Sequence, residues 1–150
     1  MAVLMLALIF TPTIVSAAPA SQEPFTATLI FQGPDYTDRQ WIDKKGIMHV
    51  KGQHQLGIIT GDIEGSVEFY ADLNMDMVSY NGDVKAKGVI TVDGGEYKIT
   101  LDGIIEAGLI SGTFVINGKG DVKGIRVEGT FTVMIAANII PLEGTMITKP

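Results

Sequence analysis

The sequence has no cysteine, and its 150 residues include few basic side chains. Without cysteine, the chain has no disulfide bridge, no thiolate zinc site and no cysteine nucleophile. The 11 lysines and arginines are scattered and are outnumbered by 17 acids, which gives a net charge of −6. Binding to nucleic acid or to an anionic membrane surface needs a concentrated basic patch. We therefore expect neither as a partner.

Charged side chains are also missing from the N-terminus, where the first one is Glu23. An apolar run over residues 2–10 is followed by small residues, and Val15-Ser16-Ala17 fits a small-x-small cleavage site. We interpret residues 1–17 as a signal peptide, with cleavage after residue 20 as the alternative, and residues 18–24 as a linker. The mature protein is then secreted or held in the cell envelope. The alternative is a membrane anchor formed by the uncleaved segment.

No helical hydrophobic period of about 3.6 residues is present from Phe25 onward. Apolar runs and period-2 alternation are separated instead by turn residues such as Asn81-Gly82-Asp83 and Asn117-Gly118. Residues 34–46 form the most irregular stretch, and we expect a loop there. The remaining pattern predicts strands over 25–31, 47–60, 63–73, 77–80, 84–92, 97–105, 109–116, 125–135 and 142–148.

The connections between these strands are short after residue 46, so neighbouring strands are expected to be antiparallel. Strands with no helix to cover a face must close into a barrel or pack as two sheets. We therefore predict an all-β domain over residues 25–150, built as a single closed antiparallel up-and-down barrel of about eight strands. A β-sandwich is the alternative.

Glycines recur at regular positions in several of the predicted strands. Residues 117–131 read NGKGDVKGIRVEGTF, residues 112–116 read GTFVI, and residues 61–65 read GDIEG. These motifs resemble the glycine-rich hairpin of the allene oxide cyclase barrel-like family, which includes small prokaryotic domains of unknown function. Plant allene oxide cyclases and dirigent proteins are more distant members. The resemblance covers roughly residues 45–135.

This resemblance implies an eight-stranded antiparallel barrel with a central cavity. In the plant cyclases that cavity holds a lipid epoxide, and in dirigent proteins a comparable cavity orients phenoxy radicals. None of the catalytic residues of those proteins can be matched to a position of this chain. The resemblance therefore supports the fold more than an activity.

The alternation within residues 61–76 shows how the faces are assigned. With no helix outside the barrel, the apolar side of a strand faces inward and the polar side faces water. This places the acids of the segment outside, where they pair with lysines and arginine on other strands. It places Ile63, Val67, Phe69 and Leu73 inside.

His54 and Tyr97 are the polar side chains expected in the interior. His54 lies in the middle of the apolar parity of residues 47–60. A buried imidazole needs a hydrogen-bonding partner, such as Tyr97 or a backbone carbonyl, and it can also bond a ligand or act as a base. A bulge next to Gly52 or Gly57 is the alternative that places His54 outside.

The catalytic residues of an enzyme with this sequence are unknown, and we predict no metal site and no cofactor. The two histidines are five residues apart on one strand, and acids along a straight strand do not present the six to eight oxygens of a calcium site. Trp41, in the expected loop, either contacts a ligand as part of a lid or plugs the end of the barrel. The residues expected to contact a ligand are His54, Tyr97, Trp41 and Phe114.

Three functions are compatible with these features. The first is binding of a small apolar ligand in the barrel interior without catalysis, which is the reading we favour. The second is a cyclase- or isomerase-like enzyme that uses His54 or Tyr97 as an acid or base. The third is a structural or interaction protein with a solid core, in which the apolar run 131–141 forms a homo-oligomer contact.

Overall fold

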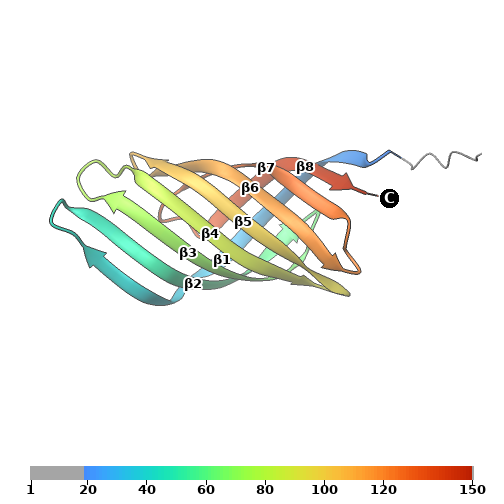
Figure 1. Cartoon of the computed structure of the whole chain (residues 1–150), viewed down its shortest axis with the longest axis horizontal. Coiled ribbons are helices and arrows are strands. Elements are labelled where there is room, and N and C mark those ends of the chain that lie inside the picture. Colours follow the sequence, from blue (N-terminus) through green and yellow to red (C-terminus); the bar gives the residue numbers. More distant parts are fainter. Residues whose placement is uncertain (1–18, 150) are drawn as a thin grey trace, which may run out of the picture.

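Eight antiparallel strands form a closed ring in the computed structural model, which describes residues 19–149 (Figure 1). Each strand pairs with the next one along the chain, and the last strand pairs with the first. The predicted up-and-down barrel is confirmed, and the sandwich alternative is wrong. The strands are β1 (Ser21–Ile42), β2 (Ile47–Gly61), β3 (Gly65–Asp76), β4 (Gly82–Val92), β5 (Gly95–Glu106), β6 (Leu109–Gly120), β7 (Ile125–Met134) and β8 (Ile139–Thr148).

The signal peptide expected over residues 1–17 lies outside the described residues. Residues 21–24, expected as part of a linker, are the first residues of β1 and pair with β8. The part of the chain from residue 19 to residue 149 contains no helix long and apolar enough to cross a membrane.

Two segments differ from the sequence prediction. Most of the expected loop at 34–46 is strand, because β1 continues to Ile42 and pairs with β2 from Ala27 to that point. Register shifts between Phe31 and Tyr36 remove the alternation by which a strand is recognised. Residues 77–80 form a turn instead of a strand, and the Asp76 carboxylate accepts hydrogen bonds from the backbone N–H groups of Val78 and Ser79.

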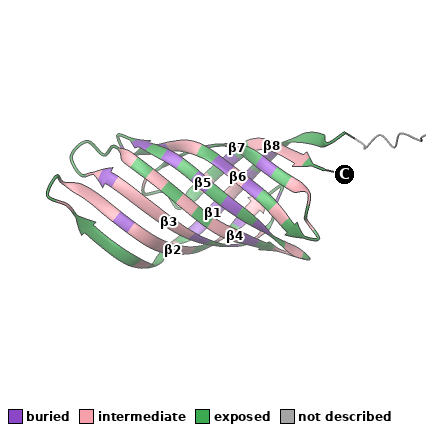
Figure 2. Cartoon of the chain, viewed as in Figure 1, coloured by how far each residue is buried: buried purple, intermediate pink, exposed green. Residues whose placement is uncertain are grey.

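Side chains that point into the ring form one continuous apolar core, visible as buried bands across the strands in Figure 2. The predicted inward face of β3 is confirmed, and Tyr97 of β5 and Phe114 of β6 also point inward. Residues at the centre of this core are at most 1% exposed, and they include Phe25, Leu29, Ile90, Ile99, Phe114, Ile116, Val127 and Leu142.

Interior aromatic side chains lie directly opposite glycines on a neighbouring strand. An aromatic ring that leans into a narrow barrel needs space beside it, and a glycine opposite provides that space. At Gly57 and Gly88 an added Cβ would lie within about 3 Å of the facing phenylalanine ring. The pairs are Phe25–Gly144, Phe31–Gly57, Phe69–Gly88, Tyr97–Gly118, Phe114–Gly129 and Phe131–Gly112.

The two ends of the barrel are filled differently. At the end that carries the chain termini, the Phe25 and Phe114 rings pack at 6.1 Å between centroids and the interior is closed by side chains. At the opposite end lie the β1–β2, β3–β4 and β5–β6 turns and the β7–β8 loop (Figure 1). The cavity described next lies in this second half.

Candidate functional site

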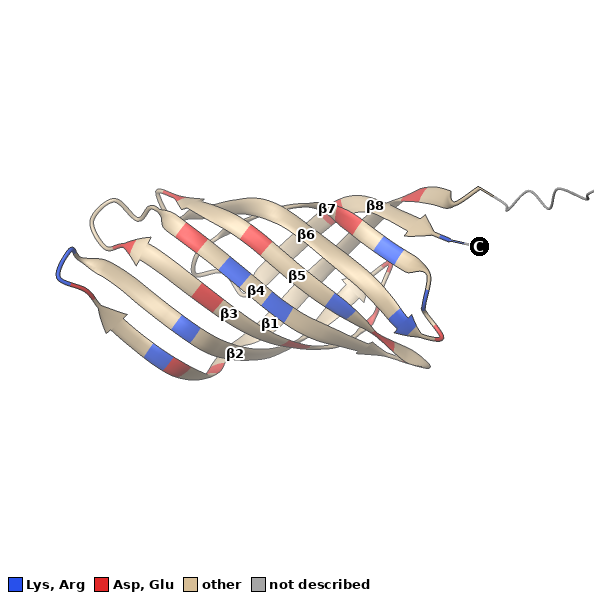
Figure 3. Ribbon diagram, in the orientation of Figure 1, with Lys and Arg blue, Asp and Glu red and all other residues tan. Residues whose placement is uncertain are grey.

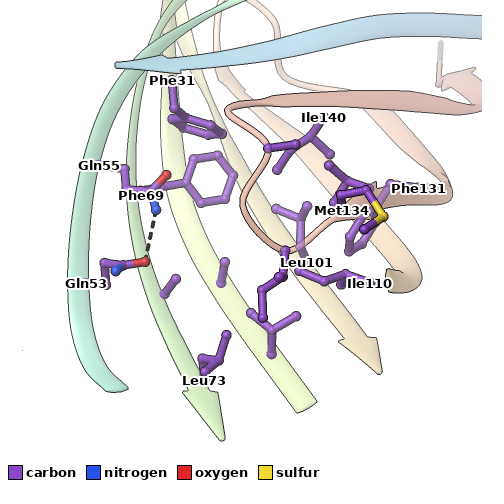
Figure 4. A pocket seen from close by; sticks show the side chains of 16 residues that line it. Phe31, Gln53, Gln55, Phe69, Leu73, Leu101, Ile110, Phe131, Met134 and Ile140 are labelled. Carbon is purple, nitrogen blue, oxygen red and sulfur yellow. Dashed lines mark hydrogen bonds between the residues drawn. The ribbon is translucent and has the colours of Figure 1, made fainter. Parts of the chain in front are cut away.

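A cavity of about 120 Å³ lies inside the barrel, in the half away from the termini (Figure 4). Apolar side chains from seven of the eight strands, together with the β7–β8 loop, form most of its wall. Two amides, Gln53 and Gln55, are its polar lining. The apolar part of the lining consists of Phe31, Phe69, Ala71, Leu73, Val84, Ala86, Leu101, Ile110, Phe131, Val133, Met134, Ile135, Ala137 and Ile140.

The two glutamines lie side by side on β2. The Nε2 group of Gln55 donates a hydrogen bond to Oε1 of Gln53 at 3.0 Å, as the dashed line in Figure 4 shows. One amide N–H₂ group and one amide oxygen of the pair are then left to bond something else. Both side chains are half-buried, so the pair offers a donor and an acceptor to a molecule in the cavity.

A β-bulge at Gly52 decides which side chains of β2 point into the cavity. The register between β2 and β3 shifts by one residue between Val50 and Gln53, and Gly52 has φ = +60°. The Asp72 carboxylate accepts from the Gly52 N–H at 2.9 Å and from the Lys51 ammonium group at 3.0 Å. The backbone hydrogen bond from Gly52, together with Lys51, lowers the pKa of Asp72, so this carboxylate holds the bulge as a charged acceptor.

The bulge reverses the parity of β2, and the expected inward position of His54 is wrong. After Gly52 the odd-numbered residues point inward, and Gln55 lies opposite the buried Phe69. His54 lies opposite Tyr70 on the outer face, where Leu56 and Ile58 are also exposed. The alternative prediction, in which a bulge next to Gly52 places His54 outside, is confirmed.

His54 is nevertheless only 6% exposed, because neighbouring side chains on the outer wall enclose it. Its ring stacks on Tyr36 of β1 at 4.6 Å between centroids and contacts the Tyr70 ring of β3 at 4.9 Å. Its Nδ1 lies 3.1 Å from Asp35 Oδ2, and its Nε2 lies 2.9 Å from Glu68 Oε1. The cluster therefore joins β1, β2 and β3 around one imidazole.

These contacts favour the charged form of the imidazole. The hydrogen bond to Glu68, followed by the one to Asp35, raises the pKa of His54 above its ordinary value despite the burial. Two carboxylates facing the two ring nitrogens are both satisfied only when both nitrogens carry a proton. In return, the hydrogen bond from His54 and then that from Tyr70 lower the pKa of Glu68.

The His54 cluster is a structural contact with little capacity for acid–base chemistry. Both ring nitrogens are bonded, one ring face stacks on Tyr36, and the tilted Tyr70 ring contacts the imidazole as well. Hydrogen bonds with Tyr36 and then with Glu68 raise the pKa of Tyr70, which keeps that phenol protonated. Within residues 19–149 no group of three or more histidines and acids is arranged to hold a metal ion.

The structure does not bring the four expected ligand contacts together. Tyr97 and Phe114 point inward, as expected, but they belong to the core and do not line the cavity. Burial raises the pKa of Tyr97. Trp41 is 38% exposed on the outer wall, where it stacks on His49 at 4.8 Å and lies under the Arg39 guanidinium at 5.0 Å. It does not plug the barrel.

The acids of residues 61–76 lie outside, as expected, among lysines of neighbouring strands (Figure 3). Lys51 pairs with Asp72 at 3.0 Å, and Lys85 pairs with Asp102 at 3.7 Å. Exposed pairs of this kind contribute about 0–1 kcal/mol each. They are features of a hydrated sheet surface and do not form a catalytic row.

The apolar run 131–141 is divided between the two sides of the wall. Phe131 and Val133 point into the interior, and Ile135 and Ile140 line the cavity. Met134 and Ile139 are exposed. Part of this run therefore lines the cavity, whereas Ala136 and Pro141 are exposed together with Met134 and Ile139.

Sequence reasoning missed Gln53 and Gln55 as polar groups in the interior. Their inward direction depends on the bulge, for which Gly52 was the available signal. The cavity lining contains no titratable side chain, so the cavity wall has hydrogen-bonding groups but no acid or base. No known protein-family model and no curated protein matches this chain, so the fold and the site geometry stand without a family assignment.

Proposed function

We propose that this protein is a binding protein whose barrel holds a small apolar molecule, or the apolar end of a longer one, in the cavity between Gln53 and Ile140. The observation that carries the proposal is an apolar cavity with a single polar pair in its wall. Binding sites for small molecules combine these two features. A half-buried pair of amides fixes the orientation of a ligand through a hydroxyl or carbonyl group.

The size of the cavity limits the ligand. Pockets for drug-sized molecules measure about 300–1,000 Å³, whereas this one is about 120 Å³. An engineered apolar cavity of about 150 Å³ binds benzene. One ring or a few methylene groups therefore fit inside, and a larger molecule would extend beyond the cavity.

The cyclase- or isomerase-like alternative has less support. It needs an acid or base in the interior, but His54 lies on the outer face and Tyr97 does not line the cavity. The third alternative, a protein with a solid core, fits only the half of the barrel around Phe25 and Phe114, where side chains fill the interior. The resemblance to the allene oxide cyclase barrel-like family agrees with a binding cavity in a barrel, and membership of that family is part of the proposal.

Binding is tested with benzene and phenol, which differ by one hydroxyl group. We expect both to shift the methyl NMR signals of Leu73 and Val84 and to raise the melting temperature as their concentration increases. Ala86→Leu fills the cavity and should weaken both ligands at least about tenfold, which corresponds to roughly 1.4 kcal/mol. Thr100→Leu, on the exposed outer wall, is the matched control and should bind like the parent chain.

The role of the amides is tested separately. Replacing both glutamines by leucine should weaken phenol more than benzene, because only phenol has a group for the amides to bond. An equal loss for both ligands would remove the amides from the site. If neither molecule binds to the parent chain, or if Ala86→Leu binds as well as the parent, the cavity is not a ligand site.

We also infer that the protein is exported, on the evidence of the apolar, uncharged residues 1–17. The test is the intact mass of the protein recovered from cell envelope and medium after expression in a secreting host. A mature chain that starts at Ala18 or Ser21 supports export by a cleaved signal peptide. A chain recovered with residues 1–17 attached, in the membrane fraction, supports the anchored alternative.

A further inference from the structure

The edge of β1 is only partly covered. Its first half pairs with β8 as far as Ile30–Ile139, and the last bond on that side joins the Phe31 N–H to the Asn138 carbonyl at 2.8 Å. On the other side, β1 continues to pair with β2 as far as Ile42–Met48. Among the described residues, no strand pairs with the free side of residues 32–42. The β1–β2 hairpin extends beyond the rest of the barrel (Figure 1).

We propose that this free edge of β1 pairs with the same edge of a second copy of the chain, antiparallel about a two-fold axis near Gln40. An open strand edge presents unpaired N–H and C=O groups and is a template for another strand. In a two-fold contact each residue meets the residue that is equally far on the other side of the axis. The sheet would then run from β2 through β1 into β1 and β2 of the second copy.

The charge distribution of the hairpin favours a second copy over an unrelated partner. The acids Asp35 and Asp38 precede Gln40, and the bases Lys44 and Lys45 follow it at the hairpin tip (Figure 3). Antiparallel pairing about Gln40 brings Asp35 of one copy opposite Lys45 of the other, twice in the dimer. Neither lysine makes an ion pair within residues 19–149, so both are available for this contact.

The side chains near the axis add apolar contact. Trp41 and Ile42 are 38% and 60% exposed. Arg39 already lies 5.0 Å above the Trp41 ring of its own chain. In the pairing about Gln40, Arg39 of each copy also meets Trp41 of the other, which adds a second cation–π contact.

Two features of β1 limit the extent of the contact. Pro34 has no N–H to donate, and the register shifts between Phe31 and Tyr36 bend the strand. The backbone ladder is therefore confined to residues 38–42, and the contacts of Asp35 with Lys45 are made by side chains beyond its ends. An interface this short belongs to the weak, small class, so we expect dimers that form and dissociate with concentration.

The parent chain and a cysteine scan provide the first test. Because the chain has no cysteine, Gln40→Cys introduces a single thiol at the expected axis. We expect Gln40→Cys to form disulfide dimers under mild oxidation at concentrations where Thr100→Cys, on the outer wall of β5, stays monomeric. Sedimentation of the parent chain should show a reversible dimer between roughly 1 μM and 1 mM. Equal cross-linking of both variants, or a parent that is monomeric throughout, overturns the proposal.

The charge argument has its own matched pair of variants. Lys44→Glu/Lys45→Glu reverses the tip charges, whereas Lys98→Glu/Lys123→Glu makes the same change in net charge away from the edge. We expect the first variant to raise the dimer dissociation constant at least about tenfold and the second to leave it nearly unchanged. Equal effects of the two variants would mean general charge repulsion and would contradict pairing through this edge. Circular dichroism confirms that both variants remain folded.

Discussion

His54 shows that the surroundings of a residue determine its chemical role. The same imidazole that would be a base in an apolar cavity is here held between two carboxylates and two tyrosine rings. The charged imidazole of β2 forms ion pairs with Asp35 of β1 and with Glu68 of β3, and so links the three strands. The residue therefore stabilises the outer wall at the point where β1 leaves β8.

The raised pKa of His54 predicts a pH-dependent stability. The folded chain binds this proton more tightly than the unfolded chain, whose histidine titrates near 6.5. The contribution of His54 is therefore fully present below pH 6.5 and is lost as the pH rises through the higher folded value. Glu68 has a pKa below 4.5 in the folded chain, so its contribution is lost only as the pH falls through that lowered value.

We expect the melting temperature to be higher at pH 5.5 than at pH 8.5, and His54→Gln to reduce that difference. An NMR titration of the His54 ring in Glu68→Gln measures the cause directly. The removal of the Glu68 charge should lower the pKa of His54 toward 6.5. A titration of His54 that is the same with and without the Glu68 carboxylate would refute this explanation.

At the scale of elements, β2 is the strand that defines the site. Its bulge, with Gly52 at positive φ and Asp72 as the acceptor, turns two glutamines inward and one histidine outward. A strand of strict alternation would have done the opposite. The chemical character of the cavity thus depends on a one-residue shift in register.

Substitutions at Gly52 test this dependence. Gly52→Val should destabilise the fold by about 1–3 kcal/mol, because a β-branched residue is strained at this φ. Gly52→Asn is the matched variant: it places a Cβ at the same point, beside Asp38, but asparagine tolerates the left-handed region better. The measurement is chemical denaturation, and we expect Asn to cost clearly less than Val. If both substitutions lower the free energy of unfolding equally, the destabilisation comes from steric contact with Asp38 and not from the backbone conformation.

At the scale of the whole molecule, one ring of strands has two different halves. In the half near the termini, Phe25 and Phe114 pack against each other and fill the interior. In the other half, small side chains such as Ala71 and Ala86 leave space between the larger ones. An eight-stranded barrel is just wide enough to be filled by side chains or to hold one small ligand. The size of the inward side chains therefore decides which half is filled.

The same division separates the stabilising part of the molecule from the part available for function. The filled half contains the most deeply buried residues, among them Phe114 and Val127. The open half carries the cavity and, beside it, the projecting β1–β2 hairpin with its free edge. A ligand in the cavity and a second copy at the edge would therefore occupy the same end of the barrel, and residues 38–42 of the edge do not line the cavity.

The sequence by itself determined the barrel and most of its faces. Short connections such as the one before Gly82 require antiparallel neighbours, and the alternation in β3, β5 and β7 places Val67, Ile99 and Val127 inside. These are local properties, because the period of a strand and the chemistry of a turn are set by neighbouring residues. Strand periodicity and turn chemistry could therefore be predicted without knowing which strands pair. The turn expected at Asn117-Gly118 is wrong in position, because β6 continues to Gly120 and the turn lies at 121–124.

The tertiary structure alone decided the position of His54, the extension of β1 to Ile42 and the location of the cavity. Each depends on contacts between residues far apart in the sequence, such as Asp72 with Gly52 or Asp35 and Glu68 with His54. A bulge changes the parity of every residue that follows it, and its position depends on the partner strand as much as on the strand itself. The outline of the barrel follows from its turns and alternation, whereas its interior chemistry follows from one long-range hydrogen bond at Gly52.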